Sequence, residues 1–201
     1  MKRLILWFAL VATAFGVAAT KLMPVSIDEL FVAADVVAIV QITEGSVIRN
    51  GATECGVRYR AQVIDVLKGA NREMSIEFGR VEGYEIGTRY LIFLAADGKR
   101  YDPLASTNSD AIRAGYDYEK KCANKWPRLN LVHSGTSAFR ISWYEEKWKS
   151  SRAAVIRPDV VDIPKAGYGG TTEKHEYPTY DGSVYVPLDD LVKHLSRVFK
   201  K

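Results

Sequence analysis

The spacing of hydrophobic residues changes along the chain, and each spacing predicts a different element. Segment 36–42 is an almost continuous apolar run rich in β-branched residues, which predicts a buried strand. Segments 57–63 and 74–78 alternate apolar and polar residues, which predicts strands with one polar face. Segment 90–94 is apolar at every position, so we expect a strand that is buried on both faces. The first half of the chain is therefore predicted to be mainly β.

Turn and cap signals bound these strands. Asn50-Gly51 predicts a tight hairpin turn, because both residues tolerate a positive φ. Loss of the alternation at 64–67 predicts a β-bulge or a strong bend. Before the first strand, Ser26 and Glu29 have the spacing of a capping box, which predicts a short helix over about 27–34.

The second half of the chain has a weaker pattern. Short strands are predicted at 139–141, 160–163 and 184–186, and 123–130 is expected to be irregular. The glycine-rich polar segment 165–182 predicts a loop or flap. The chain closes with a predicted amphipathic helix, whose apolar stripe comprises Leu188, Leu191, Val192, Leu195 and Phe199.

The N-terminus has the form of a secretory signal peptide over residues 1–19. Lys2 and Arg3 precede an apolar run that is shorter than a membrane span, and small residues follow. We expect cleavage after Ala19, or after Ala18, and a periplasmic or secreted protein without stable membrane insertion. The alternative is an uncleaved N-terminal anchor.

Length, charge and cysteine content narrow the function classes. At 201 residues the chain is long enough for one domain with an extension. Its net charge is +4, of which the predicted signal peptide supplies two, and nucleic-acid modules are usually more basic. Cys55 and Cys122 are the only cysteines. In an oxidising compartment we expect them to form a disulfide, the alternative being two separate buried thiols. Two cysteines without clustered histidines are a poor zinc site, so we expect no metal and no cofactor.

These patterns predict a mainly β fold with flanking helices. The expected architecture is an OB-like five-stranded barrel followed by a small α+β C-terminal extension with short strands and a terminal amphipathic helix. We place the barrel at 20–105 and the extension at 106–201.

The same region resembles the netrin-like domain over about residues 25–104, and in outline the tissue inhibitors of metalloproteinases and their bacterial relatives. The resemblance rests on the order of short motifs, namely 29–31, 34–37 with its Ala-Asp-Val-Val, 59–63, 66–69 with its Val-Leu-Lys-Gly, 76–78 and 87–93. It implies the barrel fold. The family's inhibitors begin with a zinc-chelating cysteine and carry several disulfides. Here the mature chain would begin at Thr20 without a cysteine, so metalloprotease inhibition does not carry over residue by residue.

Several residues invite a catalytic or ligand-binding interpretation. His133, Ser134 and Ser137 could form a serine-nucleophile site, but no G-x-S-x-G elbow is present and a polar loop is the simpler interpretation. His133, His175 and His194 lack metal-site spacing. Arg58, Arg60 and Arg89 with nearby tyrosines could contact nucleic acid, which export and the modest charge disfavour. Trp143 and Trp148 could form a contact patch, although we expect them to cover the extension's own core.

We therefore expect a non-enzymatic, exported binding protein on a netrin-like barrel, with an unidentified protein partner and no nucleic acid. One alternative is an inhibitor of a secreted or periplasmic protease, and another is an enzyme with its site in 130–180. Loops on a rigid barrel are where binding residues collect. The candidate contact residues are Thr20, Lys21 and Leu22 in the N-terminal segment and Tyr168, Tyr177 and Tyr180 in the flap.

Overall fold

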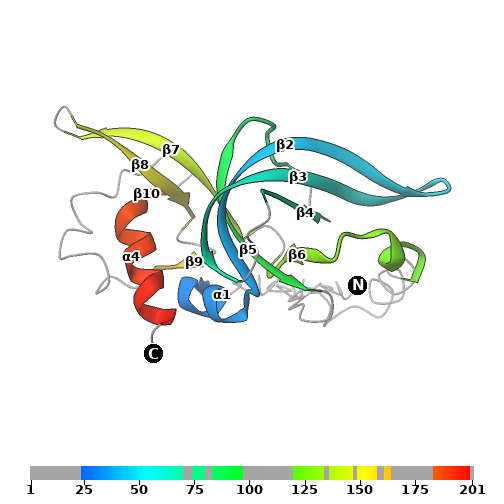
Figure 1. The fold of residues 1–201 in the computed structure, drawn as a ribbon, viewed down its shortest axis with the longest axis horizontal. Helices are drawn as coiled ribbons and strands as arrows, with labels where there is room; N and C mark the ends of the chain where they lie inside the picture. The colour runs from blue at the N-terminus through cyan, green and yellow to red at the C-terminus, as the bar shows by residue number, and fades with distance from the viewer. Residues whose placement is uncertain are drawn as a thin grey trace, which may run out of the picture.

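The structure is a computed structural model that describes residues 24–69, 74–79, 83–96, 120–133, 136–146, 149–157, 161–163 and 183–199. Within these ranges the fold is mainly β, with short helices at its two ends (Figure 1). The elements in chain order are β1 (Val25–Ser26), α1 (Ile27–Ala33), β2 (Val36–Asn50), β3 (Thr53–Lys68), β4 (Ser75–Gly79), β5 (Arg89–Ala96), η1 (Ala123–Lys125), β6 (Leu129–Leu131), β7 (Ala138–Glu146), β8 (Lys149–Ile156), β9 (Val161–Asp162), β10 (Val184–Pro187) and α4 (Leu188–Phe199).

Five of these strands close into a barrel. The order is β5-β2-β3-β4-β6, and β6 then pairs with β5 to complete the circle. Strands β7, β8 and β10 continue the sheet outward from β5, while β1 and β9 form a separate parallel pair. The predicted OB-like barrel with a C-terminal extension is therefore confirmed. Its closing strand β6, however, comes from the segment that we had expected to be irregular.

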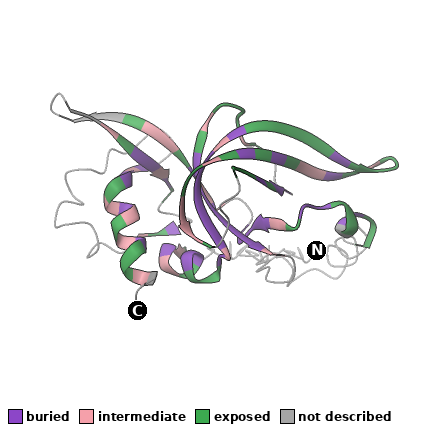
Figure 2. Ribbon diagram, in the orientation of Figure 1, coloured by how far each residue is buried: buried purple, intermediate pink, exposed green. Residues whose placement is uncertain are grey.

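Strands β2 and β5 carry two hydrophobic cores, one on each face. Alternate residues of β5 (Tyr90, Ile92 and Leu94) point into the barrel, where Ile76 and Phe78 of β4 join them. The intervening residues of β5 pack under α1, β7, β8, β10 and α4 in a second core. This explains why 36–42 and 90–94 are apolar at almost every position. Burial on both faces is visible along β5 in Figure 2.

The predicted helix caps and turns are present in the structure. Ser26 Oγ accepts a hydrogen bond from the Asp28 amide and Glu29 accepts one from the Ser26 amide, each at 3.2 Å, so the capping box at the start of α1 is confirmed. The β2–β3 hairpin closes at the pair Asn50–Thr53, and Gly51 takes a φ of +60°. The turn therefore occupies Gly51-Ala52, one residue later than the sequence signal indicated. The predicted bulge is also present, because the β2–β3 register shifts opposite 63–68.

Two of the motifs that carry the family resemblance, 34–37 and 66–69, meet at one corner of the barrel. The Asp35 carboxylate accepts a hydrogen bond from the Ala96 amide (2.9 Å), and the Asp35 amide donates to the Leu94 carbonyl (2.8 Å). Gly69 takes a φ of +96°, and a Cβ there would lie 2.6 Å from the Asp35 carbonyl oxygen. These motif residues therefore fix the junction of α1, β2, β3 and β5, and their role is structural.

Two long hairpins extend beyond the barrel on opposite sides, as Figure 1 shows. Beyond the barrel, β2 and β3 pair with each other from Val47–Val57 out to Asn50–Thr53, and most of these outer β2 residues are exposed. On the other side, β7 and β8 pair from Arg140–Val155 to Glu146–Lys149. Helices α1 and α4 lie side by side below this second hairpin, where His194 Nε2 is 2.6 Å from Asp28 Oδ1. No helix among the described residues is long and apolar enough to cross a membrane.

Candidate functional site

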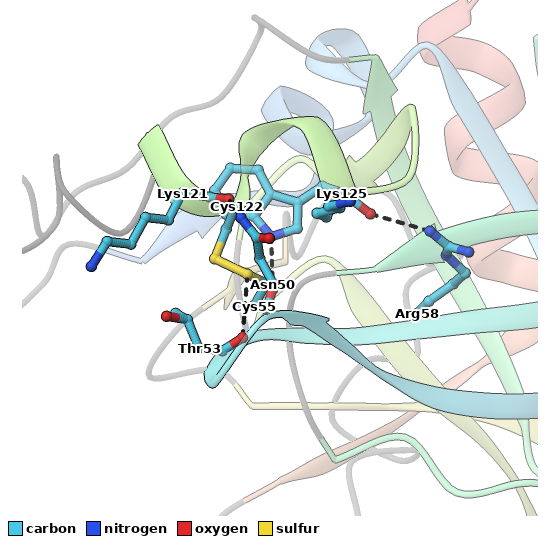
Figure 3. Close-up of a disulfide and its surroundings, with 8 residues drawn as sticks. Asn50, Thr53, Cys55, Arg58, Lys121, Cys122 and Lys125 are labelled. Carbon is cyan, nitrogen blue, oxygen red and sulfur yellow. Dashed lines mark hydrogen bonds between the residues drawn. A yellow bond between two sulfur atoms is a disulfide. The ribbon is translucent and has the colours of Figure 1, made fainter.

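A disulfide between Cys55 and Cys122 fastens the β2–β3 hairpin to the segment before β6 (Figure 3). The predicted pairing is thus confirmed, with the two Cα atoms 5.3 Å apart and 67 positions apart in the sequence. In the chain-entropy account, closing a loop of this size stabilises the fold by about 4 kcal/mol. Both cysteines are fully buried and pack with Ile48 and Trp126 in a small separate core.

Hydrogen bonds reinforce this covalent link. The Asn50 side chain donates to the Lys121 carbonyl at 2.7 Å, and Trp126 Nε1 donates to the Cys55 carbonyl at 2.7 Å. The Arg58 guanidinium donates to the Lys125 carbonyl at 3.1 Å, a contact drawn in Figure 3. We call the disulfide, these three hydrogen bonds and the four-residue core around the sulfurs the clamp. It holds the outer part of the hairpin to the chain that leads into β6.

Two of the three arginines considered for nucleic-acid binding, Arg58 and Arg60, are engaged within the protein. Arg60 lies between two carboxylates of neighbouring strands, 2.9 Å from Glu77 and 3.3 Å from Glu44. The hydrogen bond that Arg60 donates to Glu77, followed by the charge of Glu44, raises the pKa of Arg60. Arg58 belongs to the clamp, and Arg89 is exposed at the start of β5. The polar face of β2, β3 and β4 therefore carries a balanced ionic ladder rather than a basic groove.

The tyrosines considered for base stacking lie at one end of the barrel interior. Tyr84 packs edge-on against both Tyr59 and Tyr90, with ring centres 5.2 Å apart in each case. The hydroxyls of Tyr59 and Tyr90 accept hydrogen bonds from the amides of Tyr84 and Glu85. Burial, reinforced by the neighbouring tyrosines, raises the pKa of Tyr84. Tyr59 and Tyr90 are almost fully buried, so they offer no stacking surface to solvent.

The serine-nucleophile interpretation fails at Ser137. Its hydroxyl donates to the His133 carbonyl (2.8 Å) and accepts from the His133 amide (2.6 Å), so it joins the backbone at His133 to the residue just before β7. Ser137 is fully buried, and burial of the His133 ring lowers the pKa of that imidazole. Ser134 and His175 lie outside the described residues. Within those residues, no group of three or more His, Cys, Asp or Glu side chains could hold a metal ion.

Trp143 is exposed, contrary to the expectation that it covers the extension's core. It lies on β7 with 64% of its surface accessible, directly opposite Arg152 of β8. Arg152 in turn lies 3.9 Å from Asp189 in the first turn of α4. Alternation along β7 puts Phe139 and Trp143 on the same face. However, the core under that face is filled by α4 and β10 and ends before Trp143. Trp148 lies outside the described residues.

The candidate contact residues named from the sequence are not placed by the structure. Thr20, Lys21 and Leu22 precede the first described residue, Pro24, and Tyr168, Tyr177 and Tyr180 fall within 164–182. All six therefore lie outside the described residues. Trp143, which the sequence offered as a possible contact residue, is instead described and exposed. Its signal in the sequence was an aromatic residue among charged neighbours.

Comparison with known proteins adds no assignment. No family model matches the chain, and no curated protein matches its sequence. The candidate site thus rests on the geometry of the clamp and of the β7–β8 hairpin alone.

Proposed function

We propose that the protein is exported and acts as a non-enzymatic binding protein, with a netrin-like barrel as a rigid scaffold. The single observation that carries this proposal is the exposure of Trp143 on a projecting hairpin. Tryptophan and arginine are the residues that most often dominate the energy of protein interfaces, and Trp143 lies opposite Arg152. Three of the residues considered for catalysis or nucleic-acid contact, Ser137, Arg58 and Arg60, are instead engaged in structural contacts.

Export is the second part of the proposal. It is supported by the signal-peptide pattern of residues 1–19 and by a disulfide of the kind that persists in oxidising compartments. N-terminal sequencing of the protein recovered from the exported fraction should begin at Thr20, or at Ala19 for the earlier cleavage. A recovered protein that begins at Met1 would contradict export with cleavage.

A capture experiment tests the binding surface. The mature wild type, Trp143→Ala and Val47→Ala serve as bait for proteins of the exported fraction. Val47 is a matched control because it is a similarly exposed apolar residue on the opposite hairpin, 53% accessible. A partner retained by wild type and Val47→Ala but lost from Trp143→Ala supports the proposal. If all three proteins retain the partner equally, Trp143 is not part of the interface.

The identity of the captured protein separates the remaining alternatives. A protease whose activity falls on adding the mature protein would establish the inhibitor alternative, which the family resemblance motivates. Turnover by the purified protein in a hydrolase panel would replace the binding proposal with an enzyme whose site lies in 130–180.

A further inference from the structure

Strand β6, which closes the barrel, is the shortest of the five barrel strands. It spans only Leu129–Leu131 and pairs with β4 through two register pairs, Phe78–Leu129 and Gly79–Asn130. Its pairing with β5 adds three more register pairs, at residues 94–96. Strand β5 ends at Ala96 and β6 begins at Leu129, so their pairing closes a long loop, which costs conformational entropy. The pairing of β6 with β4 and β5 should therefore contribute little stability without a further link.

The clamp lies immediately before this strand. Trp126 is buried against the sulfurs and hydrogen-bonded to Cys55, and Leu129 follows three residues later. Pro127 lies close to β4, because a Cβ added at Gly79 would be 3.1 Å from its ring. Only residues 123–128 separate Cys122 from the start of β6. A disulfide that holds Cys122 at the hairpin therefore also keeps β6 near its place in the barrel.

We propose that barrel closure depends on the oxidation state of Cys55 and Cys122. In the disulfide form the clamp keeps β6 between β4 and β5. Reduction by a dithiol transfers two electrons and two protons to the disulfide. The S–S bond breaks, two cysteine thiols form, and the dithiol becomes a disulfide. Strand β6 then leaves the barrel, while the remaining strands and helices stay folded. This inference goes beyond the proposed binding function and does not depend on it.

The release is local because the second core does not rest on β6. That core joins α1, α4, β7, β8 and β10 to the outer faces of β2 and β5. Its one described contribution from the β6 region is Val132, just after the strand. By contrast, Leu131 packs inside the barrel with Phe78 and Leu94, so departure of β6 opens the barrel interior between β4 and β5.

The closed form also shields the disulfide from reductants. Both cysteines have no accessible surface, and thiol–disulfide exchange needs direct attack on a sulfur atom. A reductant therefore reaches the bond only after local opening of the clamp. A chain that has been oxidised once should stay closed in mildly reducing surroundings, whereas a chain that has never been oxidised keeps β6 free.

Hydrogen–deuterium exchange followed by mass spectrometry tests the proposal on the full mature chain. The wild type is compared in its oxidised form and after complete reduction with dithiothreitol, which keeps both sulfur atoms in place. We expect amides of 129–132 to exchange at least about tenfold faster after reduction. Such a loss of protection is typical of local opening. Amides of β2 at 36–42 and of α4 should be unchanged. The variant with Cys55→Ala and Cys122→Ala should reproduce this pattern.

Asn50→Ala is the matched control, because it removes the hydrogen bond to Lys121 and leaves the disulfide intact. Its β6 amides should stay protected. Equal protection of 129–132 in the oxidised and reduced wild type would overturn the proposal, since β6 would then be held by its own pairing. Exchange that rises equally in β6, β2 and α4 would also overturn it, because the disulfide would then stabilise the whole fold.

Discussion

Lys68 at the end of β3 caps the last turn of α1 at Phe31. Its ammonium donates to the Phe31 carbonyl at 2.7 Å and to the Val32 carbonyl at 3.0 Å, and it lies 5.2 Å from the centre of the Phe31 ring. The last carbonyls of a helix lack intrahelical donors and carry the negative end of its dipole. One side chain thus satisfies the helix end and joins it to the barrel.

Replacing this lysine should therefore weaken the corner. Lys68→Met keeps the aliphatic stem but removes the charged donor, and we expect the free energy of unfolding to fall by about 1–3 kcal/mol. Urea denaturation followed by circular dichroism measures the change. Lys193→Met, at an exposed position of α4, is the control and should lie within about 0.5 kcal/mol of wild type. Equal stabilities of wild type and Lys68→Met would show that Lys68 does not stabilise the fold by capping α1.

Gly69 beside this lysine has no room for a side chain. Its φ of +96° and the short distance from an added Cβ to the Asp35 carbonyl both oppose alanine. We expect Gly69→Ala to lower the free energy of unfolding by about 1–3 kcal/mol. Gly51→Ala is an informative comparison, because Gly51 has a positive φ but open space around it. A larger loss at Gly51 than at Gly69 would show that the contact with Asp35 does not matter.

Core truncations should separate residues that the sequence treats alike. The strand pattern places Val63, Ile76 and Ile92 inside the barrel. Ile76 and Ile92 are almost fully buried, whereas Val63 is only partly buried beside the bulge. We expect Ile92→Ala and Ile76→Ala to cost about 2–4 kcal/mol each and Val63→Ala less. Ile64→Ala, which truncates an exposed neighbour, should be nearly neutral. Denaturant midpoints would contradict this order if Val63→Ala were the most damaging.

Acid should destabilise the protein partly through His133. Burial lowers the pKa of this imidazole in the fold, with Glu29 acting in the opposite direction. The unfolded chain then binds the proton more readily than the folded one. The contribution to stability is present above the ordinary pKa of 6.5 and is lost as pH falls below it. Unfolding free energies at pH 7.5 and 5.5 should therefore differ more for wild type than for His133→Gln. An equal difference in both proteins would exclude His133 as a source.

The sequence analysis predicted the elements in which burial produces a regular pattern of apolar and polar residues. Continuous apolar runs identified β2 and β5, because both faces of these strands meet a core. Alternation identified β3 and β4, and capping chemistry identified α1. The helix α4 followed from its apolar stripe, of which Leu188, Leu191 and Leu195 are buried.

Other elements leave no such trace. Strand β6 is three residues long, too short for a period, and it pairs with β4 and β5, which lie far from it in the sequence. The first half of β8 is polar because it lies on the outer part of a hairpin, so it did not resemble a strand. Trp143 was expected to cover the core of the extension, but that core includes Phe139 and Ile141 of β7 and not Trp143, which is a tertiary property. The roles of Arg58 and Arg60 likewise depend on partners from other strands.

Sharing β5 between the two cores has a consequence for cooperativity. Neighbouring residues such as Ile92 and Phe93 lie in different cores, yet one backbone segment holds both. Neither core keeps its shape if that strand melts, so the barrel and the C-terminal extension should melt in a single calorimetric transition. With the disulfide intact, the calorimetric and van't Hoff enthalpies should therefore agree.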